Sequence, residues 1–342
     1  MVTVLWIVSL AAIVLLAGVI YQHAGSLRDR KRYANPGRWI NVGRGSDLFL
    51  FELGTGEPNV IFEAGIGATH LNWRNIQTSV SRFAPTVSYD RAGLGWSGPS
   101  RTPRTPAHIA TELHRALQRA GLKPPYVLVG HSFGGLVMRR FALLYPGEVA
   151  SLLLIDPMRC EEWPPLNPRS QSQLNMGRKL IRYAIPITRL GVARLGVNLL
   201  FCRARKLSTQ IAGAAVPNGH HVLSRITTEV GKMPREVWPA VASHWSRPEF
   251  YAGLRCHLES IPDTVREMHV AEPIRAIPVT VLTPGSAAPL TENQLDHIGD
   301  RVNQVIAANS DHWIHLDEPE IVINSIRDMV TSTMTQSVMS TR

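Results

Sequence analysis

The stretch YVLVGHSFGG, residues 126–135, decides the fold of this protein. An apolar, β-branched run leads directly into Ser132, which stands between Gly130 and Gly134, and a helical pattern follows up to Pro146. One interpretation is a tight turn built from small residues. A strand, a Gly-x-Ser-x-Gly turn and a helix in this order, however, typically present the serine as a nucleophile in a strained turn. The glycines then stand where side chains would collide.

Strands and helices are predicted to alternate on both sides of this stretch. Apolar runs bounded by glycine or proline predict strands, and apolar residues at helical spacing predict helices. The predicted strands cover 38–43, 47–54, 59–65, 86–93, 126–130, 149–156, 277–285 and 303–309, and the helices cover 108–121, 133–146, about 291–302 and the chain from Glu318. This alternation indicates an α/β fold with a mostly parallel central sheet and helices on both faces.

The alternation stops between residues 157 and 276. No convincing strand occurs there, and helical patterns cover 176–201 and 236–245 among many prolines. A connection between a strand and a helix usually has about 2–6 residues. We therefore expect residues 157–276 to form an inserted helical module.

Five motifs follow one another along the chain: FEAGIGATHLNW, YDRAGLGWS, GHSFGG, LLLIDP and SDHWIHLDEP. With them the chain resembles the α/β-hydrolases, in particular capped serine enzymes such as esterases, lipases and proline-iminopeptidase-like enzymes. The resemblance covers about residues 38–156 and 277–331. It implies a hydrolase core over 38–156 and 277–335, with residues 157–276 as a helical cap inserted after strand 6.

A serine hydroxyl needs a base to take its proton, and the chain has 13 histidines from which to choose. The resemblance implies the chain order Ser, Asp, His, with the histidine after the last strand. His312 and His315 both stand there. We expect His312 to be the base, because it comes first and precedes Pro319 by the seven residues seen in the family's final loop. The other histidines considered are expected to pack beneath the turn (His131), to lie on a helix surface (His108, His114) or to be solvated in the cap (His220, His221).

The third member of a triad holds the imidazole in position and stabilises its charged form. It usually follows strand 7, where this chain reads VLTPGSAAPLTEN and has no aspartate at the family's position. Strand 6 ends in Asp156, at the sheet edge where Ser132 also stands. We therefore expect Asp156 to be the acid. Glu292 is the alternative, and Asp296 and Asp300 stay open.

The oxyanion hole needs two backbone donors. The resemblance implies the amide of Phe133 and, from the loop after strand 3, the amide of Ile66, where Ala64-Gly65 replaces the frequent His-Gly pair. Asp90 and Arg91 are expected to pin the loop after strand 4. A metal site formed by the two late histidines with Asp311 and Asp317 is a weaker interpretation, and we expect neither a metal nor a cofactor.

The N-terminus carries about twenty residues, 2–21, without a charge. At roughly 1.5 Å per residue a helix of this length reaches about 30 Å, the thickness of a bilayer core. The alternative is a cleaved signal peptide, but the run is longer than a signal core and no basic residue precedes it. We expect a single-pass anchor over 2–21 and a basic linker over 22–37. The cluster in RDRKRY at 28–33 favours a cytoplasmic catalytic domain and contact with anionic headgroups.

The formal net charge of +10 favours anionic partners. Nucleic acid is the weaker choice, because no zinc-finger spacing, RNA-binding aromatic motif or long lysine tract occurs. Segment 176–201 mixes apolar residues with arginines and lysine, which suits an anionic membrane surface. The alternative is a cap helix packed on the pocket with solvated arginines.

Three cysteines far apart fit a reducing compartment. The oligomeric state stays open.

These patterns predict a membrane-anchored serine hydrolase that cleaves a small-molecule or lipid-like carboxylic ester through an acyl-enzyme. Serine in place of an aspartate nucleophile argues against an epoxide hydrolase or haloalkane dehalogenase. The alternatives are a cofactor-free haloperoxidase, an amide or peptide hydrolase on the same triad, and a binding protein that keeps the fold without catalysis.

Overall fold

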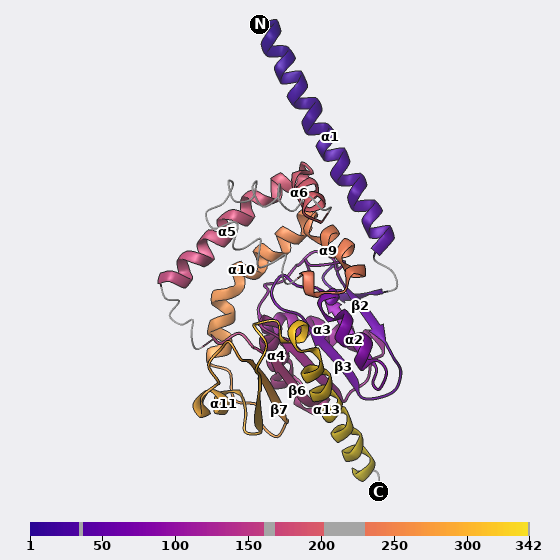
Figure 1. The fold of residues 1–342 in the computed structure, drawn as a ribbon, viewed down its shortest axis with the longest axis vertical. Coiled ribbons are helices and arrows are strands. Elements are labelled where there is room, and N and C mark those ends of the chain that lie inside the picture. The colour runs from indigo at the N-terminus through magenta and orange to yellow at the C-terminus, as the bar shows by residue number, and fades with distance from the viewer. Residues whose placement is uncertain (34–36, 161–167, 202–229, 341–342) are drawn as a thin grey trace.

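The computed structural model describes residues 1–33, 37–160, 168–201 and 230–340, which include one eight-stranded sheet (Figure 1). The strand order is β1-β2-β4-β3-β5-β6-β7-β8. The strands are β1 (Arg38–Gly43), β2 (Ser46–Leu53), β3 (Asn59–Glu63), β4 (Thr86–Asp90), β5 (Tyr126–His131), β6 (Val149–Ile155), β7 (Val279–Pro284) and β8 (Val302–Ala307). β2 pairs antiparallel with β1 and β4, and all other pairs are parallel. This is the predicted α/β-hydrolase sheet.

The central strands are apolar because both of their faces are covered. All residues of β3, β4 and β5 are buried. In the register, Leu128 of β5 lies between Ile61 of β3 and Leu152 of β6. The carboxyl ends of β3, β4, β5 and β6 therefore reach the same edge of the sheet, and the loops that follow them meet there.

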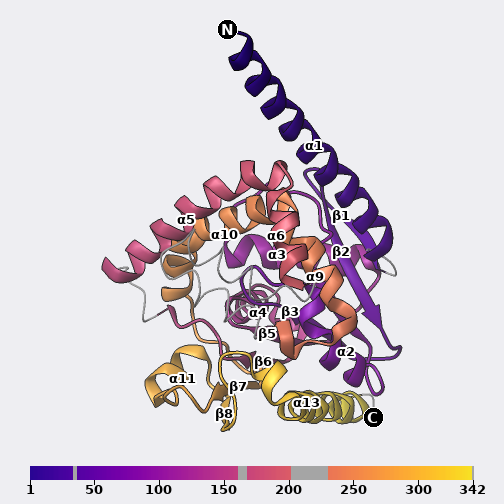
Figure 2. The same ribbon diagram turned by 45° about the horizontal axis from the view of Figure 1, so that its top comes forward.

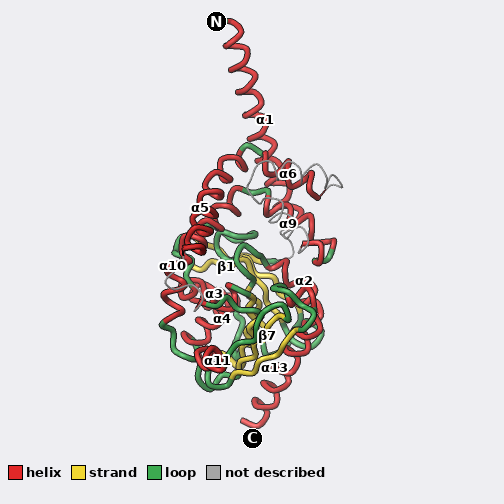
Figure 3. Tube along the Cα trace, turned by 60° about the vertical axis from the view of Figure 1, so that its left-hand side comes forward, coloured by secondary structure: helices red, strands yellow, loops and turns green. Residues whose placement is uncertain are grey.

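Helices lie on both faces, as Figure 3 shows. On one face, α2 (Arg74–Val80) and α13 (Pro319–Ser340) pack on inward residues such as Val129 and Ile155. On the other, α3 (Pro106–Ala120) and α4 (Phe133–Leu144) pack on residues such as Leu128 and Leu154. The remaining core helices are short: η1 (His70–Trp73), η2 (Pro146–Glu148), α11 (Glu292–Ile298) and α12 (Ile314–Asp317). α11 is shorter than predicted because it ends before Gly299, just ahead of β8.

The inserted segment is helical where it is described. It contains α5 (Pro168–Arg189), α6 (Val192–Phe201), η4 (Arg235–Val237), α9 (Trp238–Trp245) and α10 (Pro248–His269). The pattern over 176–201 predicted one helix, but Gly191 has a φ of 77° and separates α5 from α6. The sequence did not predict α10, whose helical pattern is interrupted by Pro262. His220 and His221 lie outside the described residues.

The N-terminal helix α1 (Val2–Tyr33) protrudes from the rest of the molecule (Figures 1 and 2). It contains an 18-residue window with a mean hydropathy of 2.7 that is not buried in the protein, so the helix is long and apolar enough to cross a membrane. Residues 22–33 of the predicted linker over 22–37 belong to this helix. The helix continues through the basic segment to Tyr33, because residues beyond 21 pack against the cap.

Candidate active site

Ser132 occupies the sharp turn between β5 and α4. Its φ of 54° and ψ of −120° form a conformation that costs a non-glycine residue free energy. A Cβ atom on Gly130 would lie 2.6 Å from the Gly134 carbonyl oxygen, so the turn excludes a side chain there. The Ser132 amide donates to the Ile155 carbonyl (3.0 Å), and the Met158 amide donates to the Ser132 carbonyl (3.2 Å). These bonds join the turn to the end of β6.

Asp156 and His312 lie in contact at this edge. Asp156 follows β6, has a φ of 38°, and donates its amide to the Leu282 carbonyl (2.8 Å). The His312 Nδ1 atom lies 2.6 Å from Asp156 Oδ2. The His312 side chain is 32% exposed and that of Asp156 is 18% exposed, so the pair is open on one side. A carboxylate that accepts the Nδ1 proton leaves Nε2 as the basic nitrogen.

The alternative acids lie elsewhere. Glu292 stands exposed in the first turn of α11, and Asp296 lies exposed on the same helix. Asp300 accepts a hydrogen bond from the Ala276 amide (3.1 Å). In the described part of the chain, Asp156 is the carboxylate bonded to the His312 ring.

His131 and His315 form the buried support beneath His312. The His131 Nε2 atom lies 2.8 Å from the His312 carbonyl oxygen, which makes Nε2 the protonated nitrogen of His131. Burial lowers the pKa of His131 well below its ordinary value, and the neighbouring histidines lower it further. His315 packs between Trp73 and His131, with ring centroids 4.7 and 4.5 Å away, and burial lowers its pKa to about 3. Neither ring is placed to act as an exposed base.

The loop after β3 lies beside the nucleophile. A Cβ atom on Gly65 would lie 3.6 Å from Ser132 Cβ and 3.1 Å from His131 Nδ1. The next residue, Ile66, is half-buried, and Phe133 is the first residue of α4. No backbone acceptor within the described segments takes up the amide of Ile66 or Phe133. Both amides are thus available to an oxyanion beside Ser132.

Arg91 fixes the orientation of this loop. Its Nη2 donates to the Gly65 carbonyl oxygen, and its guanidinium carbon lies 5.1 Å from the centroid of the Phe133 ring. In a trans peptide the carbonyl and the following amide point in opposite directions. The bond to Gly65 therefore turns the Ile66 amide away from Arg91. The expectation that Arg91 pins the loop after β4 is too narrow, because Arg91 also contacts Gly65 in the loop after β3 and the ring of Phe133 in α4.

Glu63 and Tyr89 complete the buried cluster around Arg91. Arg91 Nη1 lies 3.6 Å from Glu63 Oε1, and the Tyr89 hydroxyl donates to Glu63 Oε2. Burial raises the pKa of Glu63 to about 7, against the opposing effects of Arg91 and Tyr89. Sequence reasoning missed this cluster. The available signal was an acid at the end of one buried strand, Glu63 of β3, and a base directly after its neighbour β4, Arg91.

Asp90 ties the loops after β3 and β4 together. It accepts hydrogen bonds from the His70 amide (2.9 Å), His70 Nδ1 (2.8 Å) and the Trp96 amide (2.8 Å). Burial alone would raise the pKa of Asp90, but His70 and the hydrogen bonds lower it on balance. Its role in the structure extends beyond the local pinning that the sequence predicted.

The cap helix α10 lies over this edge. Gly253 packs against the Gly93 backbone, and a Cβ atom on Gly67 would lie 3.4 Å from Leu254 Cδ1. The His257 ring lies 5.8 Å from that of Phe133. α10 therefore covers the loop after β3 and the first turn of α4.

The other predicted residues lie away from this centre. His108 is exposed, as expected, but His114 is largely buried and stacks on Tyr145 with ring centroids 3.7 Å apart. Asp317 pairs with Lys232 (2.6 Å) and accepts a hydrogen bond from the Asp311 amide (3.1 Å). These bonds account for the Asp317 carboxylate.

Comparisons with known proteins agree on the fold. A family model described as the alpha/beta hydrolase fold matches residues 58–191. The uncharacterized protein YqjL of Bacillus subtilis is 34% identical over 104 residues, which are 30% of this chain and 41% of that protein. An AB hydrolase superfamily protein of Gibberella zeae is 36% identical over 98 residues, 28% of this chain and 30% of its own. The chain thus spans less than half the length of these curated relatives.

A solved structure extends the likeness to most of the chain. The epoxide hydrolase CorEH superposes with a TM-score of 0.61 at 15% identity, over 87% of this chain and 99% of its own. At this identity the likeness concerns the fold alone.

Proposed function

We propose that this chain, an α/β-hydrolase by fold, is a serine hydrolase that cleaves carboxylic esters through an acyl-enzyme. The observation that carries the proposal is the 2.6 Å contact between His312 and Asp156 at the edge where Ser132 stands in its strained turn. A nucleophile, a base and an orienting acid at one site are the requirements of acyl transfer by a serine.

In the proposed reaction, Ser132 Oγ attacks the ester carbonyl carbon while His312 Nε2 takes the hydroxyl proton. The negative charge that forms on the carbonyl oxygen is bound by the Ile66 and Phe133 amides. His312 then gives its proton to the departing alcohol, which leaves an acyl group on Ser132. Water attacks this acyl group, again with His312 as the base, and the acid is released. Asp156 keeps the imidazole in the required tautomer throughout.

The identity of the nucleophile separates this proposal from the activity named for CorEH. An ester intermediate on a serine has a carbonyl carbon that water attacks at an oxyanion hole. Ser132 supplies such an intermediate only from an acyl substrate. Ester cleavage is therefore favoured over epoxide opening.

We also propose that α1 is retained as a membrane anchor. Residues of its second half bond to the cap, since Arg194 Nη1 lies 2.5 Å from Asp29 Oδ2 and Gln22 Nε2 donates to the Ser246 carbonyl (2.9 Å). Cleavage of α1 as a signal peptide near Ala24 would remove Gln22. These contacts support an uncleaved helix over a removed leader.

Ser132→Ala tests the chemistry. We expect it to abolish labelling by a fluorophosphonate probe and to lower ester turnover by about 10⁴–10⁶ while the fold is kept. Ser81→Ala, on an α2-flanking turn away from the edge, is the matched control and should keep both. Labelling without turnover of any p-nitrophenyl ester would favour the amide hydrolase or haloperoxidase alternative. Absence of labelling in the unmodified chain would favour a non-catalytic binding protein.

A further inference from the structure

A row of apolar side chains on α5 faces solvent. Met176, Leu180, Tyr183 and Ile187, here called the outer stripe, are each 42–56% exposed. Their spacing of four, three and four residues places them on one face of the helix. Val192 and Leu195 of α6 are also 55% exposed. Contiguous exposed apolar surface of this kind marks an interaction site.

The opposite face of α5 is the one that packs on the protein. Leu174 is buried, a Cβ atom on Gly177 would lie 3.3 Å from Leu258 Cδ1, and Arg178 Nη2 donates to the Leu258 carbonyl (3.1 Å). α5 is therefore held against α10 by one side, and the outer stripe is directed away from the hydrolase core.

The docking of α1 places the outer stripe relative to the apolar half of that helix. Gly18 packs against the Leu190 carbonyl directly after α5, and the Tyr21 hydroxyl accepts a hydrogen bond from Asn198 of α6 (3.0 Å). The Arg194 side chain fills the space above Gly25, with Nε 2.7 Å from where a Cβ atom would stand. The cap is thus attached to α1 directly below residues 2–17, which protrude.

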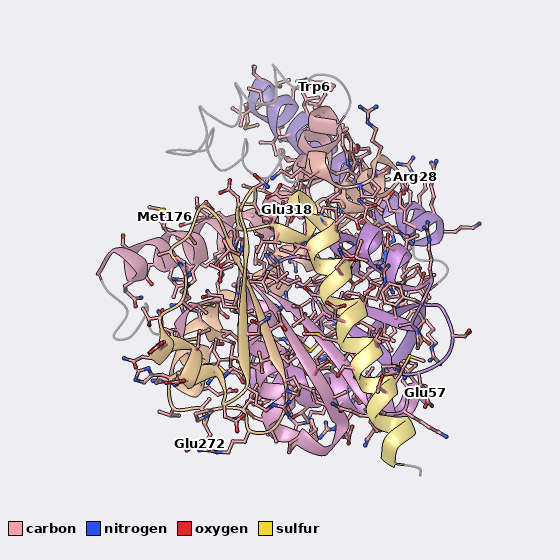
Figure 4. All side chains as sticks on the ribbon, turned by 60° about the horizontal axis from the view of Figure 1, so that its bottom comes forward. Trp6, Arg28, Glu57, Met176, Glu272 and Glu318 are labelled. Carbon is pink, nitrogen blue, oxygen red and sulfur yellow. The ribbon has the colours of Figure 1, made fainter. Side chains whose placement is uncertain are left out.

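The views agree on the direction of α5. Figures 1 and 2 show α5 crosswise to α1, on the side of the molecule from which the N-terminal half of α1 extends. Figure 4 shows Trp6 and Arg28 toward one end of the molecule, Met176 at one side level with Glu318, and Glu57 and Glu272 toward the other end. A bilayer crossed by residues 2–21 would therefore have its surface along α5.

Charge distinguishes this part of the chain from the rest. Between Glu162 and Glu229 the sequence has ten lysines and arginines and no acidic residue. The formal charge of this segment, +10, is therefore as large as the net charge of the whole chain. On α5, Lys179, Arg182 and Arg189 are exposed beside the outer stripe. Apolar side chains flanked by cations are the composition of a helix that lies in an anionic membrane surface.

We propose that the outer stripe of α5 is a membrane-binding face, which lies in the headgroup region of an anionic bilayer beside the point where α1 enters it. This inference rests on the proposal that α1 is a membrane anchor, and it is independent of the reaction at Ser132. Of the two interpretations of segment 176–201, the proposal adopts the membrane surface. Because α10 lies between α5 and the loop after β3, the cap then connects the proposed active site with the bilayer surface.

Photo-crosslinking in the full chain tests this face. The photoreactive residue p-benzoylphenylalanine would replace Met176, Leu180 or Tyr183, one at a time, in protein reconstituted into nanodiscs of phosphatidylcholine and phosphatidylglycerol. Met334 is the matched control, because its exposure of 52% is close to the 53% of Met176 and because it belongs to α13, which runs to the end of the molecule opposite the N-terminus (Figure 1). Trp6 reports on the anchor itself.

We expect lipid adducts at the α5 positions to exceed those at Met334 by at least about fivefold. The yield at Tyr183 should fall in a triple variant that removes three charges, Lys179→Gln/Arg182→Gln/Arg189→Gln. It should also fall in nanodiscs of phosphatidylcholine alone, which carry no net negative charge. Adducts at Trp6 with none above control at α5 would overturn the proposal and leave the anchor standing. Absence of adducts at Trp6 would overturn both. Fluorophosphonate labelling of the same samples reports separately on the folded active site.

Discussion

At the scale of single residues, Asp156 owes its position to the end of β6. The His312 ring reaches it at 2.6 Å, whereas Glu292 lies exposed on α11. Asp156→Asn keeps the shape but lets the imidazole take the wrong tautomer, a change that costs about 10⁴ in turnover in serine proteases. Glu292→Gln should cost less than about tenfold. Turnover of a short-chain ester by both variants at one pH checks this, and a crippled Glu292→Gln beside a nearly normal Asp156→Asn would reverse the assignment.

Arg91 is expected to be a positioning residue for the oxyanion hole. Loss of one oxyanion donor costs about 10²–10³ in turnover, so loss of the group that orients the Ile66 amide should cost at least about tenfold. Arg91→Met should lower kcat with little change in KM. Arg104→Met is the control. Arg104 is equally buried, but it pairs with Glu112 (2.8 Å), whereas Arg91 bonds to Gly65 in the loop after β3. A merely structural role would give both variants the same loss of thermal stability and the same kcat.

Sequence reasoning named Ser132 and Asp156 because each stands directly after a strand whose apolar run is easy to recognise. It named His312 because the resemblance implies a histidine in the final loop, seven residues before Pro319. It placed His131 beneath the turn but missed its hydrogen bond to His312, and it missed the contact of Arg91 with Gly65, because both depend on how loops after different strands approach one another. The Gly65 carbonyl and the His312 carbonyl are backbone atoms, and residue types do not reveal which side chain will bind them.

At the scale of elements, the sheet could be predicted from the sequence, whereas much of the cap could not. Continuous apolar strands predicted the sheet and its edge, since burial on both faces leaves a plain pattern. α10 and the break at Gly191 were not predicted, because cap helices are apolar on one side only and contain prolines such as Pro262. The length of α1 was underestimated for a related reason. Its second half is polar by composition yet is held by polar contacts with the cap.

The joint between α1 and the cap should depend on Arg194. Its side chain is 3% exposed and bonds to Gln22, Ser26 and Asp29, whose own side chain is 10% exposed. Arg194→Met leaves Asp29 without its partner, and breaking a buried pair in this way costs about 3–5 kcal/mol. We expect a lower thermal midpoint in detergent, partly restored by Asp29→Leu in the same chain. Arg189→Met removes an exposed arginine and should change little, so an equal loss in both would contradict the joint.

At the scale of the whole molecule, the N-terminal half of α1, the cap and the sheet follow one another along the long axis (Figure 1). The apolar half of α1 protrudes at one end and α13 ends at the other (Figure 1). The cap lies between, and the edge with Ser132 faces the cap. Of this arrangement, the sequence predicted the parts but not their order in space, because the contacts of α1 with α6 and α9 link segments about 165–225 residues apart.

The basic residues that flank the apolar span of α1 predict on which side of the membrane the catalytic domain lies. The basic residues Arg28, Arg30, Lys31 and Arg32 follow the apolar span within one helix. Basic residues next to a span are retained on the cytoplasmic side, and the exposed basic residues of α5 lie on that same side of the span. We therefore expect a protease added outside intact cells to spare a C-terminal tag and to remove it after permeabilisation. A tag placed before Met1 should show the reverse accessibility. Removal of the C-terminal tag from intact cells would place the catalytic domain outside the cell. The basic residues would then face the outer leaflet of the membrane.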